Sequence, residues 1–388
     1  MILYDATHTS HTRAQTGIQR VCRSLHTALA RRGGITAVCH DPYLGAWRTL
    51  NANEQGRLRP APEAGQSRGA RWPWHQKISG RLRRLVGSRP ALPTGAGFIC
   101  PELFSPEVGA HLPEIFFAVT GPRVAVFHDA IGLKLPELTP PGTVRRLPAY
   151  LRELLQFDGI AANSHDSAAS LLDYWQWLGV ATRPDVTAIP LGLDECHAIP
   201  DTPAGAVPRV LCVGTLEGRK NHLALLEACE TLWGEGLVFE LQLMGMARPD
   251  TAAAPLAKIA ALKAAGRPLL YDGPAGDAAL QAAYQRCAFT VYPSLMEGFG
   301  LPVLESLQHG KPCICSGEGA LGESTFDGGC VTLETVDAVA LSGAIRRLLK
   351  NPAEITTLSA KARGRKFKTW DQYAGELTAW MATLPPRA

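Results

Sequence analysis

The sequence lacks the features of membrane-spanning, exported and metal-stapled proteins. It contains no run of about 18 consecutive apolar residues, which argues against a transmembrane helix. The first residues do not show the basic and then apolar pattern of a signal peptide. The ten cysteines are scattered without a CxxC pair, so they predict reduced, structural thiols. We therefore expect a cytoplasmic protein with no metal site.

Charge and composition argue against two further classes. The 39 Lys and Arg residues only slightly exceed the 35 Asp and Glu residues, which is far from the charge excess of a dedicated nucleic-acid binder. Hydrophobic residues make up 46% of the chain, too many for a disordered protein. A length of 388 residues is enough for about two or three domains. The composition indicates a globular protein without a nucleic-acid partner.

Strand and helix signals alternate along the chain in two blocks. A short apolar run, a Gly-containing loop, an amphipathic helix from Gly17 and an apolar strand at 35–39 form a βαβ pattern. The Pro-containing segment 199–208 (IPDTPAGAVP) marks a domain boundary, and alternation resumes after it. These patterns predict an α/β protein with two Rossmann-like parallel-sheet domains, 1–198 and 209–368, facing a central cleft.

One segment, 57–89, interrupts the alternation. It holds nine Lys or Arg residues against one acid, Glu63, and contains Trp72 and Trp74. Two interpretations remain open. The segment contacts the anionic headgroups of a membrane, or it is a solvated surface insert.

The segment 292–305 (YPSLMEGFGLPVLE) carries the densest chemistry. Glu297 stands in a Gly-rich loop after a predicted strand, and Gly298 and Gly300 allow close approach of the backbone to a ligand. A proline then suits the first turn of a helix, whose N-terminus favours an anion. Glu305 lies on that helix, where a carboxylate accepts hydrogen bonds from ribose or hexose hydroxyls. The alternative is a turn with a capping acid.

A second motif, 214–221 (GTLEGRKN), also follows a strand and opens a helix. Arg219 and Lys220 stand at the helix start, where the helix dipole disfavours cations. This placement suggests an anionic ligand such as a diphosphate, which arginine binds through two parallel hydrogen bonds. The segment is neither a Walker A sequence nor GxGxxG. A solvated basic turn is the alternative.

Together these motifs resemble the retaining glycosyltransferases of family 4, which have the GT-B fold. VGTLEGRKN (213–221) and EGFGLPVLE (297–305) carry the resemblance, and the spacing of Glu297 and Glu305 matches the family's E-x7-E signature. The segments VFHDAIGLKLPE (126–137) and TGIQR (16–20) are similar to loops of its N-terminal domain. The resemblance also implies that 369–388 forms a terminal helix that crosses back to the N-terminal domain.

The resemblance implies a role for each matching residue. Arg219 and Lys220 neutralise the leaving diphosphate, Glu297 contacts the transferred sugar and Glu305 contacts the ribose. The implied catalytic residues are His128, Arg219, Lys220 and Glu297. The implied nucleotide-sugar-binding residues are Gly17, Gly214, Arg219, Lys220, Glu297, Gly298, Phe299, Gly300, Leu301 and Glu305. One departure concerns the first loop, where Thr16 precedes Gly17 in place of the second glycine that the family often carries.

The implied activity is retaining transfer of a hexose from a nucleoside-diphosphate sugar, with GDP-mannose as the first candidate, to a glycan or lipid-linked glycan. No DxD motif precedes the predicted strand ends, and Arg and Lys can stabilise the leaving group, so we expect no metal or other cofactor. A GT-B phosphorylase or sugar-phosphate synthase is one alternative. A non-catalytic glycan- or nucleotide-binding protein is the other. The expected location is the cytoplasm, with the inner face of the membrane included.

Overall fold

The computed structural model describes residues 1–14, 16–59, 69–195 and 207–385. The chain divides into two compact units. The first comprises Met1–Ala130, Gly142–Asp194 and Lys368–Ala388, and the second comprises Ile131–Pro141 and Glu195–Phe367. The stretch 131–141 therefore groups with the second unit, although the predicted first domain 1–198 included it.

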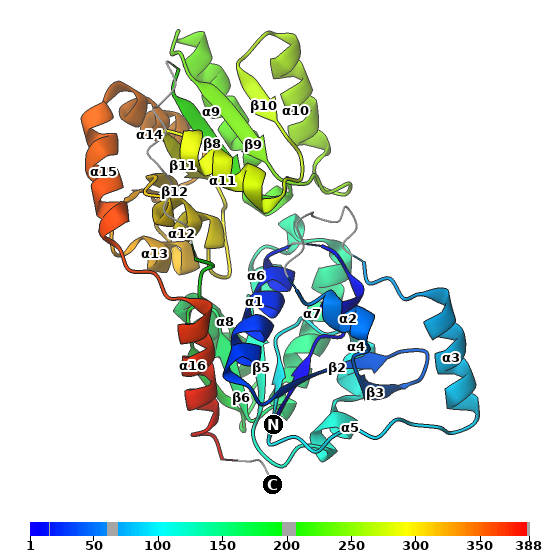
Figure 1. Ribbon diagram of the computed structural model, residues 1–388. Helices are drawn as coiled ribbons and strands as arrows, with labels where there is room; N and C mark the ends of the chain where they lie inside the picture. Colours follow the sequence, from blue (N-terminus) through cyan, green and yellow to red (C-terminus); the bar gives the residue numbers. More distant parts are fainter. Residues whose placement is uncertain (15, 60–68, 196–206, 386–388) are drawn as a thin grey trace. The chain divides into compact units, whose positions relative to one another are not determined.

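The first unit is built on a seven-stranded sheet with the order β3-β2-β1-β4-β5-β6-β7 (Figure 1). All neighbouring pairs are parallel except β2 with β3. Its strands are β1 (Ile2–Asp5), β2 (Ile35–Asp41), β3 (Ala46–Thr49), β4 (Gly97–Cys100), β5 (Arg123–Phe127), β6 (Gly159–Ala162) and β7 (Asp185–Ala188). Its helices are α1 (Gly17–Arg32), α2 (Ala52–Gly56), α3 (Trp74–Leu85), α4 (Pro106–Ala110), α5 (Leu112–Phe117), α7 (Pro141–Glu153), α8 (His165–Trp177) and α16 (Trp370–Met381).

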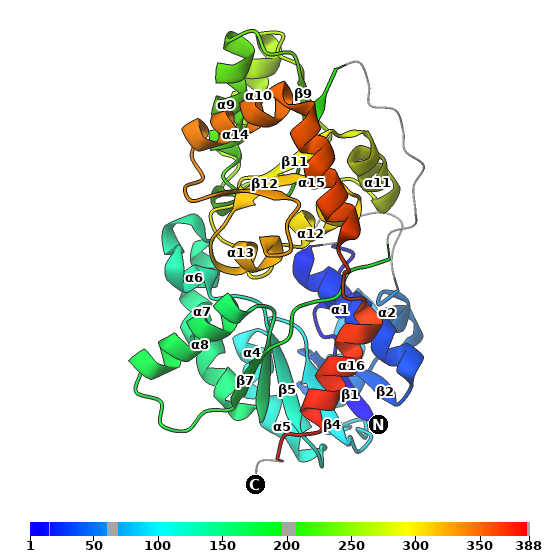
Figure 2. The same ribbon diagram turned by 90° about the vertical axis from the view of Figure 1, so that its left-hand side faces the viewer.

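The last helix, α16, packs against α1 within the first unit (Figure 2). Thr369 and Gln372 form a reciprocal capping box at its start. Its apolar face, with Tyr373 and Leu377, is buried. The Arg32 guanidinium at the end of α1 donates to the Asp371 carbonyl at 2.9 Å. The C-terminal segment thus completes the core of a unit whose sheet is formed near the other end of the chain.

The second unit contains a six-stranded parallel sheet with the order β10-β9-β8-β11-β12-β13. Its strands are β8 (Arg209–Val213), β9 (Glu240–Met244), β10 (Leu269–Tyr271), β11 (Phe289–Tyr292), β12 (Cys313–Ser316) and β13 (Cys330–Leu333). Its helices are α6 (Ile131–Lys134), α9 (His222–Gly234), α10 (Ala253–Ala264), α11 (Asp277–Arg286), α12 (Leu301–Gln308), α13 (Gly319–Thr325), α14 (Ala338–Lys350) and α15 (Pro352–Gly364).

Burial explains why helix α9 is apolar on most of its surface. Both α10 and α14 pack against it, and its residues Leu225, Leu226 and Leu232 lie fully buried in the main core of the unit. The central strand β11 is buried along its whole length, as expected for a parallel strand covered on both faces. The alternation seen in the sequence therefore reflects a sheet with helices on both sides.

The structure bears on two segments that the sequence singles out. The segment 57–89, which interrupts the alternation of strands and helices, contains helix α3, and its composition did not predict this helix. Residues 60–68 of the segment lie outside the described residues. Most of the predicted boundary 199–208 also lies outside them. Among the described residues, no helix is both long and apolar enough to cross a membrane.

Candidate functional site

The second unit brings the two predicted motifs to one edge of its sheet. Strands β8 and β11 are neighbours, but the chain proceeds from β8 to β9 and β10 on one side and from β11 to β12 and β13 on the other. In open parallel sheets, ligands bind beside the carboxyl ends of the strands at such a switch in order. Segment 214–221 follows β8 and segment 293–300 follows β11, so both lie at this position.

Arg219, Lys220 and Glu297 form an ion cluster there, in which Lys220 and Glu297 are buried and Arg219 is partly exposed. Lys220 Nζ lies 2.5 Å from Glu297 Oε1, and Arg219 Nη1 lies 2.8 Å from Glu297 Oε2. Lys220 also donates to the hydroxyl of Tyr292, the last residue of β11. Arg219 makes a second ion pair with Glu217 at 2.9 Å. One carboxylate, Glu297, therefore holds both cations side by side.

Burial and charge oppose each other in this cluster. Burial alone favours the neutral form of Glu297, but Arg219 and Lys220 outweigh it and lower the pKa of Glu297 to about 2. Burial lowers the pKa of Lys220, and the carboxylate of Glu297 opposes that effect. Glu297 is therefore ionised at neutral pH and is the counter-charge of Lys220.

The loop before α12 requires glycine at position 300. Gly300 has a φ of +103°, and a Cβ atom there would lie 2.9 Å from Leu321 Cδ2. The Ser324 hydroxyl donates to the Phe299 carbonyl at 2.8 Å, which joins the loop to α13. Leu301 then begins α12. These contacts determine the path of the loop that carries Glu297.

Two further predicted residues belong to the second unit, one beside the ion cluster and one on helix α12. Gly214 lies directly beside it, since a Cβ atom there would be 3.9 Å from Tyr292 Cε2 and 4.0 Å from Lys220 Cδ. Glu305 is buried on α12 and accepts a hydrogen bond from the Tyr284 hydroxyl at 3.3 Å. The second unit thus gathers its predicted site residues on the two loops and on α12.

The other two predicted residues, Gly17 and His128, belong to the first unit. Gly17 is the first residue of α1. The buried His128 ring donates from Nε2 to the Pro101 carbonyl at 2.7 Å, and its Nδ1 lies 3.0 Å from Asn163 Nδ2. Both ring nitrogens are therefore occupied by protein groups. A contact between His128 and a sugar stays a prediction.

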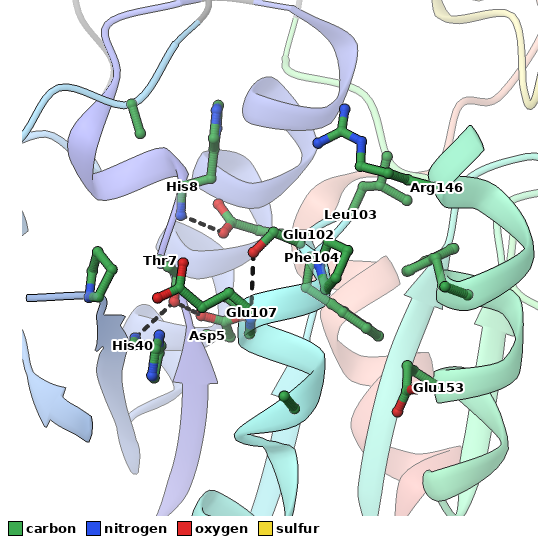
Figure 3. Close-up of a pocket in the computed structure, with 18 of the residues that line it drawn as sticks. Asp5, Thr7, His8, His40, Glu102, Leu103, Phe104, Glu107, Arg146 and Glu153 are labelled. Atoms are coloured by element: carbon green, nitrogen blue, oxygen red, sulfur yellow. Dashed lines mark hydrogen bonds between the residues drawn. The ribbon is translucent and has the colours of Figure 1, made fainter. Parts of the chain in front are cut away.

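The first unit has a cavity of about 640 Å³ at the corresponding switch in strand order, between β1 and β4 (Figure 3). Asp5 ends β1 and Glu102 follows β4, and both carboxyls line the cavity. Apolar side chains, among them Phe104 and Leu147, supply other parts of the wall. The cavity therefore combines apolar surface with acceptors for hydroxyl groups.

Local hydrogen bonds hold the two carboxyls. Asp5 accepts from the backbone N–H of Thr7 at 2.9 Å and from its hydroxyl at 2.6 Å. Glu102 accepts from the backbone N–H groups of His8 at 2.7 Å and Thr9 at 2.6 Å. Burial raises the pKa of Asp5 to about 7, with a further contribution from Glu102, and burial also raises the pKa of Glu102. The pair therefore binds a proton more tightly than exposed carboxyls do.

Two buried polar atoms in the cavity wall lack a partner within the described part of the chain. They are Nε2 of His40 and the hydroxyl of Tyr150. Burial, together with His111, lowers the pKa of His40 to about 4, so its ring is neutral, and burial raises the pKa of Tyr150. Buried polar groups are normally hydrogen-bonded, so these two atoms distinguish the cavity wall from an ordinary apolar core. Within the same described ranges, no three His, Cys, Asp or Glu side chains are grouped to hold a metal ion.

Comparison with known proteins places the chain in a family. Residues 207–351 match the family described as glycosyl transferases group 1. The O-antigen chain mannosyltransferase B of Escherichia coli is 30% identical over 264 residues, which cover 64% of this chain and 67% of that protein. The chain belongs to the glycosyl transferases group 1 family.

A second relative is much longer than this group 1 glycosyl transferase. The serotype-specific mannosyltransferase WbdA of Escherichia coli is 26% identical over 345 residues, or 81% of this chain. The chain spans 38% of the length of that relative. The narrower assignment to family 4, with its E-x7-E signature, stays an inference from the resemblance.

Solved structures show the fold of the group 1 glycosyl transferase. Sucrose-phosphate synthase from Thermosynechococcus elongatus is similar with a TM-score of 0.66 and 18% identity over 98% of each chain. HepE from Anabaena, solved in complex with UDP and glucose, has a TM-score of 0.70 and 13% identity over 99% of each chain. The predicted GT-B fold with two parallel-sheet domains is confirmed. The cleft between them stays a prediction.

The residues of this cavity were not predicted from the sequence. Asp5 ends an apolar strand and Glu102 follows one, in the segments ILYD and GFICPE, and such strand ends are where site residues of α/β proteins occur. The positions of Asp5 and Glu102 at strand ends could therefore have predicted them as site residues. His40 and Tyr150 carry no comparable signal, because a single histidine or tyrosine within an apolar segment is typical of a core.

The raised pKa of Asp5 leads to a prediction about stability. The pKa is about 7 in the folded protein and about 3.9 in an unfolded chain, so the stability that the protonated group contributes is present below pH ~4 and is lost as the pH rises through 7. Asp5→Asn, which keeps an acceptor for Thr7, should gain stability relative to the wild type between pH 5 and 8, by up to about 4 kcal/mol.

Thermal melts from pH 5 to 8 test this prediction. The difference in Tm between Asp5→Asn and wild type should grow by several degrees with pH, because the histidines titrate alike in both proteins. Asp173→Asn, an exposed change in the same unit, is the matched control and should show no such trend. A Tm difference that stays constant with pH would contradict the assignment of a retained proton to Asp5.

Proposed function

We propose that this group 1 glycosyl transferase is a retaining hexosyltransferase that takes mannose from GDP-mannose and needs no metal or other cofactor. The observation that carries the proposal is the pairing of Arg219 and Lys220 with the buried Glu297 at the switch point of the second sheet. Two adjacent cations there provide the charge that a leaving diphosphate requires. The relatives named as mannosyltransferases support the choice of mannose.

The proposed reaction breaks the bond between the anomeric carbon and the diphosphate. An acceptor hydroxyl attacks from the face that the diphosphate leaves and gives its proton to the departing diphosphate oxygen, so the configuration is retained. Arg219 and Lys220 neutralise the charge that develops on the leaving group. Glu297 exchanges part of its pairing with them for a contact to the transferred sugar. Glu305, on the helix that follows, accepts hydrogen bonds from ribose hydroxyls.

The cavity of the first unit is the proposed acceptor site. Its carboxyls, Asp5 and Glu102, accept hydrogen bonds from hydroxyl groups, while the Tyr150 hydroxyl and neutral His40 have hydrogen-bonding capacity still to satisfy. Apolar walls beside these groups match the alternating apolar and polar faces of a sugar ring. A glycan end fits this chemistry better than an anionic acceptor, since the carboxyls of Asp5 and Glu102 line the cavity.

The proposed setting is synthesis of a cell-surface polysaccharide in the cytoplasm, at the inner face of the membrane. An O-antigen mannosyltransferase among the relatives supports a growing glycan, free or lipid-linked, as the acceptor. The nucleotide sugar and the glycan are the two partners that the two sites require.

Thermal shifts with nucleotides test the donor. We expect GDP, added without magnesium, to raise the Tm by several degrees at about 100 times its Kd, where binding adds about 2.7 kcal/mol. UDP, dTDP, ADP and CMP should have smaller effects. GDP-mannose should then release GDP when a mannan oligosaccharide is present. If none of the diphosphates shifts the Tm and no GDP is released, the proposal is wrong, and a phosphorylase or a binding protein takes its place.

A further inference from the structure

Helix α3 of the first unit exposes an apolar stripe to solvent. Trp74, Ile78, Leu82 and Leu85 are 74%, 50%, 57% and 82% exposed. At about 100° per residue these four positions fall within about 80° of one another around the helix axis, so they form one stripe. Large apolar side chains that gather on one exposed face mark an interaction surface.

The rest of the first unit holds α3 by the opposite side. Gly80 is the one buried residue within this helix, and a Cβ atom there would lie 2.9 Å from Tyr43 Cβ. Gly80 lies about 160° around the axis from the middle of the apolar stripe. Figure 1 shows α3 at the outer edge of the unit, beside the β2–β3 hairpin. The stripe therefore faces away from the core.

Basic side chains lie beside the stripe, along one side of it. Lys77 Nζ and Arg81 Cζ both lie 5.6 Å from the centre of the Tyr43 ring, and Arg83 and Arg84 are exposed. The sequence contains no Asp or Glu between Glu63 and Glu102. This positively charged surface is complementary to an anionic partner. The apolar stripe is complementary to a partner with an apolar interior.

We propose that α3 lies in the plane of an anionic phospholipid bilayer and inserts its stripe at the boundary between headgroups and acyl chains. The 12 residues of the helix are too few to span a bilayer but suit an interfacial helix. Its arginines and lysine bind the lipid phosphates. This inference goes beyond the catalytic proposal and is independent of which donor the enzyme uses.

Vesicle flotation of the full chain tests the inference. Wild type should bind vesicles of phosphatidylcholine with phosphatidylglycerol, bind pure phosphatidylcholine poorly, and dissociate in high salt. Leu82→Glu should lower binding at least about tenfold. Lys77→Gln and Arg81→Gln should each lower it about fivefold. Val339→Glu is the matched control, because Val339 is 79% exposed on α14 of the second unit and the charge change is the same.

Three results would overturn the inference. The first is equal vesicle binding by Leu82→Glu and wild type. The second is a concentration-dependent dimer in light scattering that Leu82→Glu abolishes, because a second copy of the chain then covers the stripe. The third is binding that does not depend on lipid charge. Release of GDP by Leu82→Glu with a soluble acceptor should equal that of wild type, so a failure of this inference is separate from a failure of the catalytic proposal.

Discussion

Lys220→Met is expected to lower kcat about 10²- to 10³-fold, which corresponds to roughly 2.7 to 4 kcal/mol of transition-state stabilisation. The Lys220 ammonium lies in a buried site, 2.5 Å from Glu297 Oε1, and it also donates to the Tyr292 hydroxyl. A charge in such a site acts more strongly on a developing diphosphate than the same charge in water. Methionine keeps the apolar stem and removes the charge.

The alternative explanation for such a loss is damage to the fold. Removal of one partner from a buried ion pair costs about 3 to 5 kcal/mol when the other charge is left alone. Here Arg219 still pairs with Glu297, so Lys220→Met should remain folded in thermal melts. Lys263→Ala, an exposed change in the same unit, is the control and should leave kcat unchanged. Wild-type turnover by Lys220→Met would remove the diphosphate assignment.

For the ion cluster, the sequence predicts the two loops that carry the charged residues but not the contact between them. Arg219 and Glu297 are far apart in the sequence, yet each stands in a Gly-containing loop directly after an apolar strand, and that pattern is readable. Their contact requires β8 and β11 to be neighbours, which is a property of the strand order. The role of Tyr292 as a second partner of Lys220 could not be predicted either, because a tyrosine that ends a buried strand is typical of a core residue.

The cavity and the exposed face of helix α3 are two further features that could not be predicted from the sequence. Tyr150 and Asp5 meet in one cavity only because the strand order brings β1 beside β4 and α7 packs nearby, and no local pattern encodes this. For α3, the spacing of Trp74, Ile78 and Leu82 is helical, but a stripe of that kind normally faces the core. The packing of Gly80 on Tyr43 decides that it faces solvent.

Glu297→Gln is expected to tighten the binding of GDP about tenfold while turnover falls about 100-fold or more. In the unliganded protein the Glu297 carboxylate occupies both Arg219 and Lys220, so a diphosphate must compete with it for these cations. Glutamine has the same shape without the charge, which leaves the cations to the diphosphate. The turnover falls because the proposed contact of Glu297 with the transferred sugar, which strengthens in the transition state, is lost.

Calorimetry of GDP binding at several pH values, together with steady-state kinetics, separates these two effects. Burial lowers the pKa of Lys220, and Glu297 normally opposes that effect, so in Glu297→Gln the ammonium loses its proton at a lower pH than in wild type. The gain in affinity should therefore be largest near pH 6 and fade toward pH 9. Glu230→Gln, which alters an exposed ion pair with Lys258, should change neither quantity. Weaker GDP binding by Glu297→Gln at every pH would instead mean that the carboxylate positions the two cations for the diphosphate and does not compete with it.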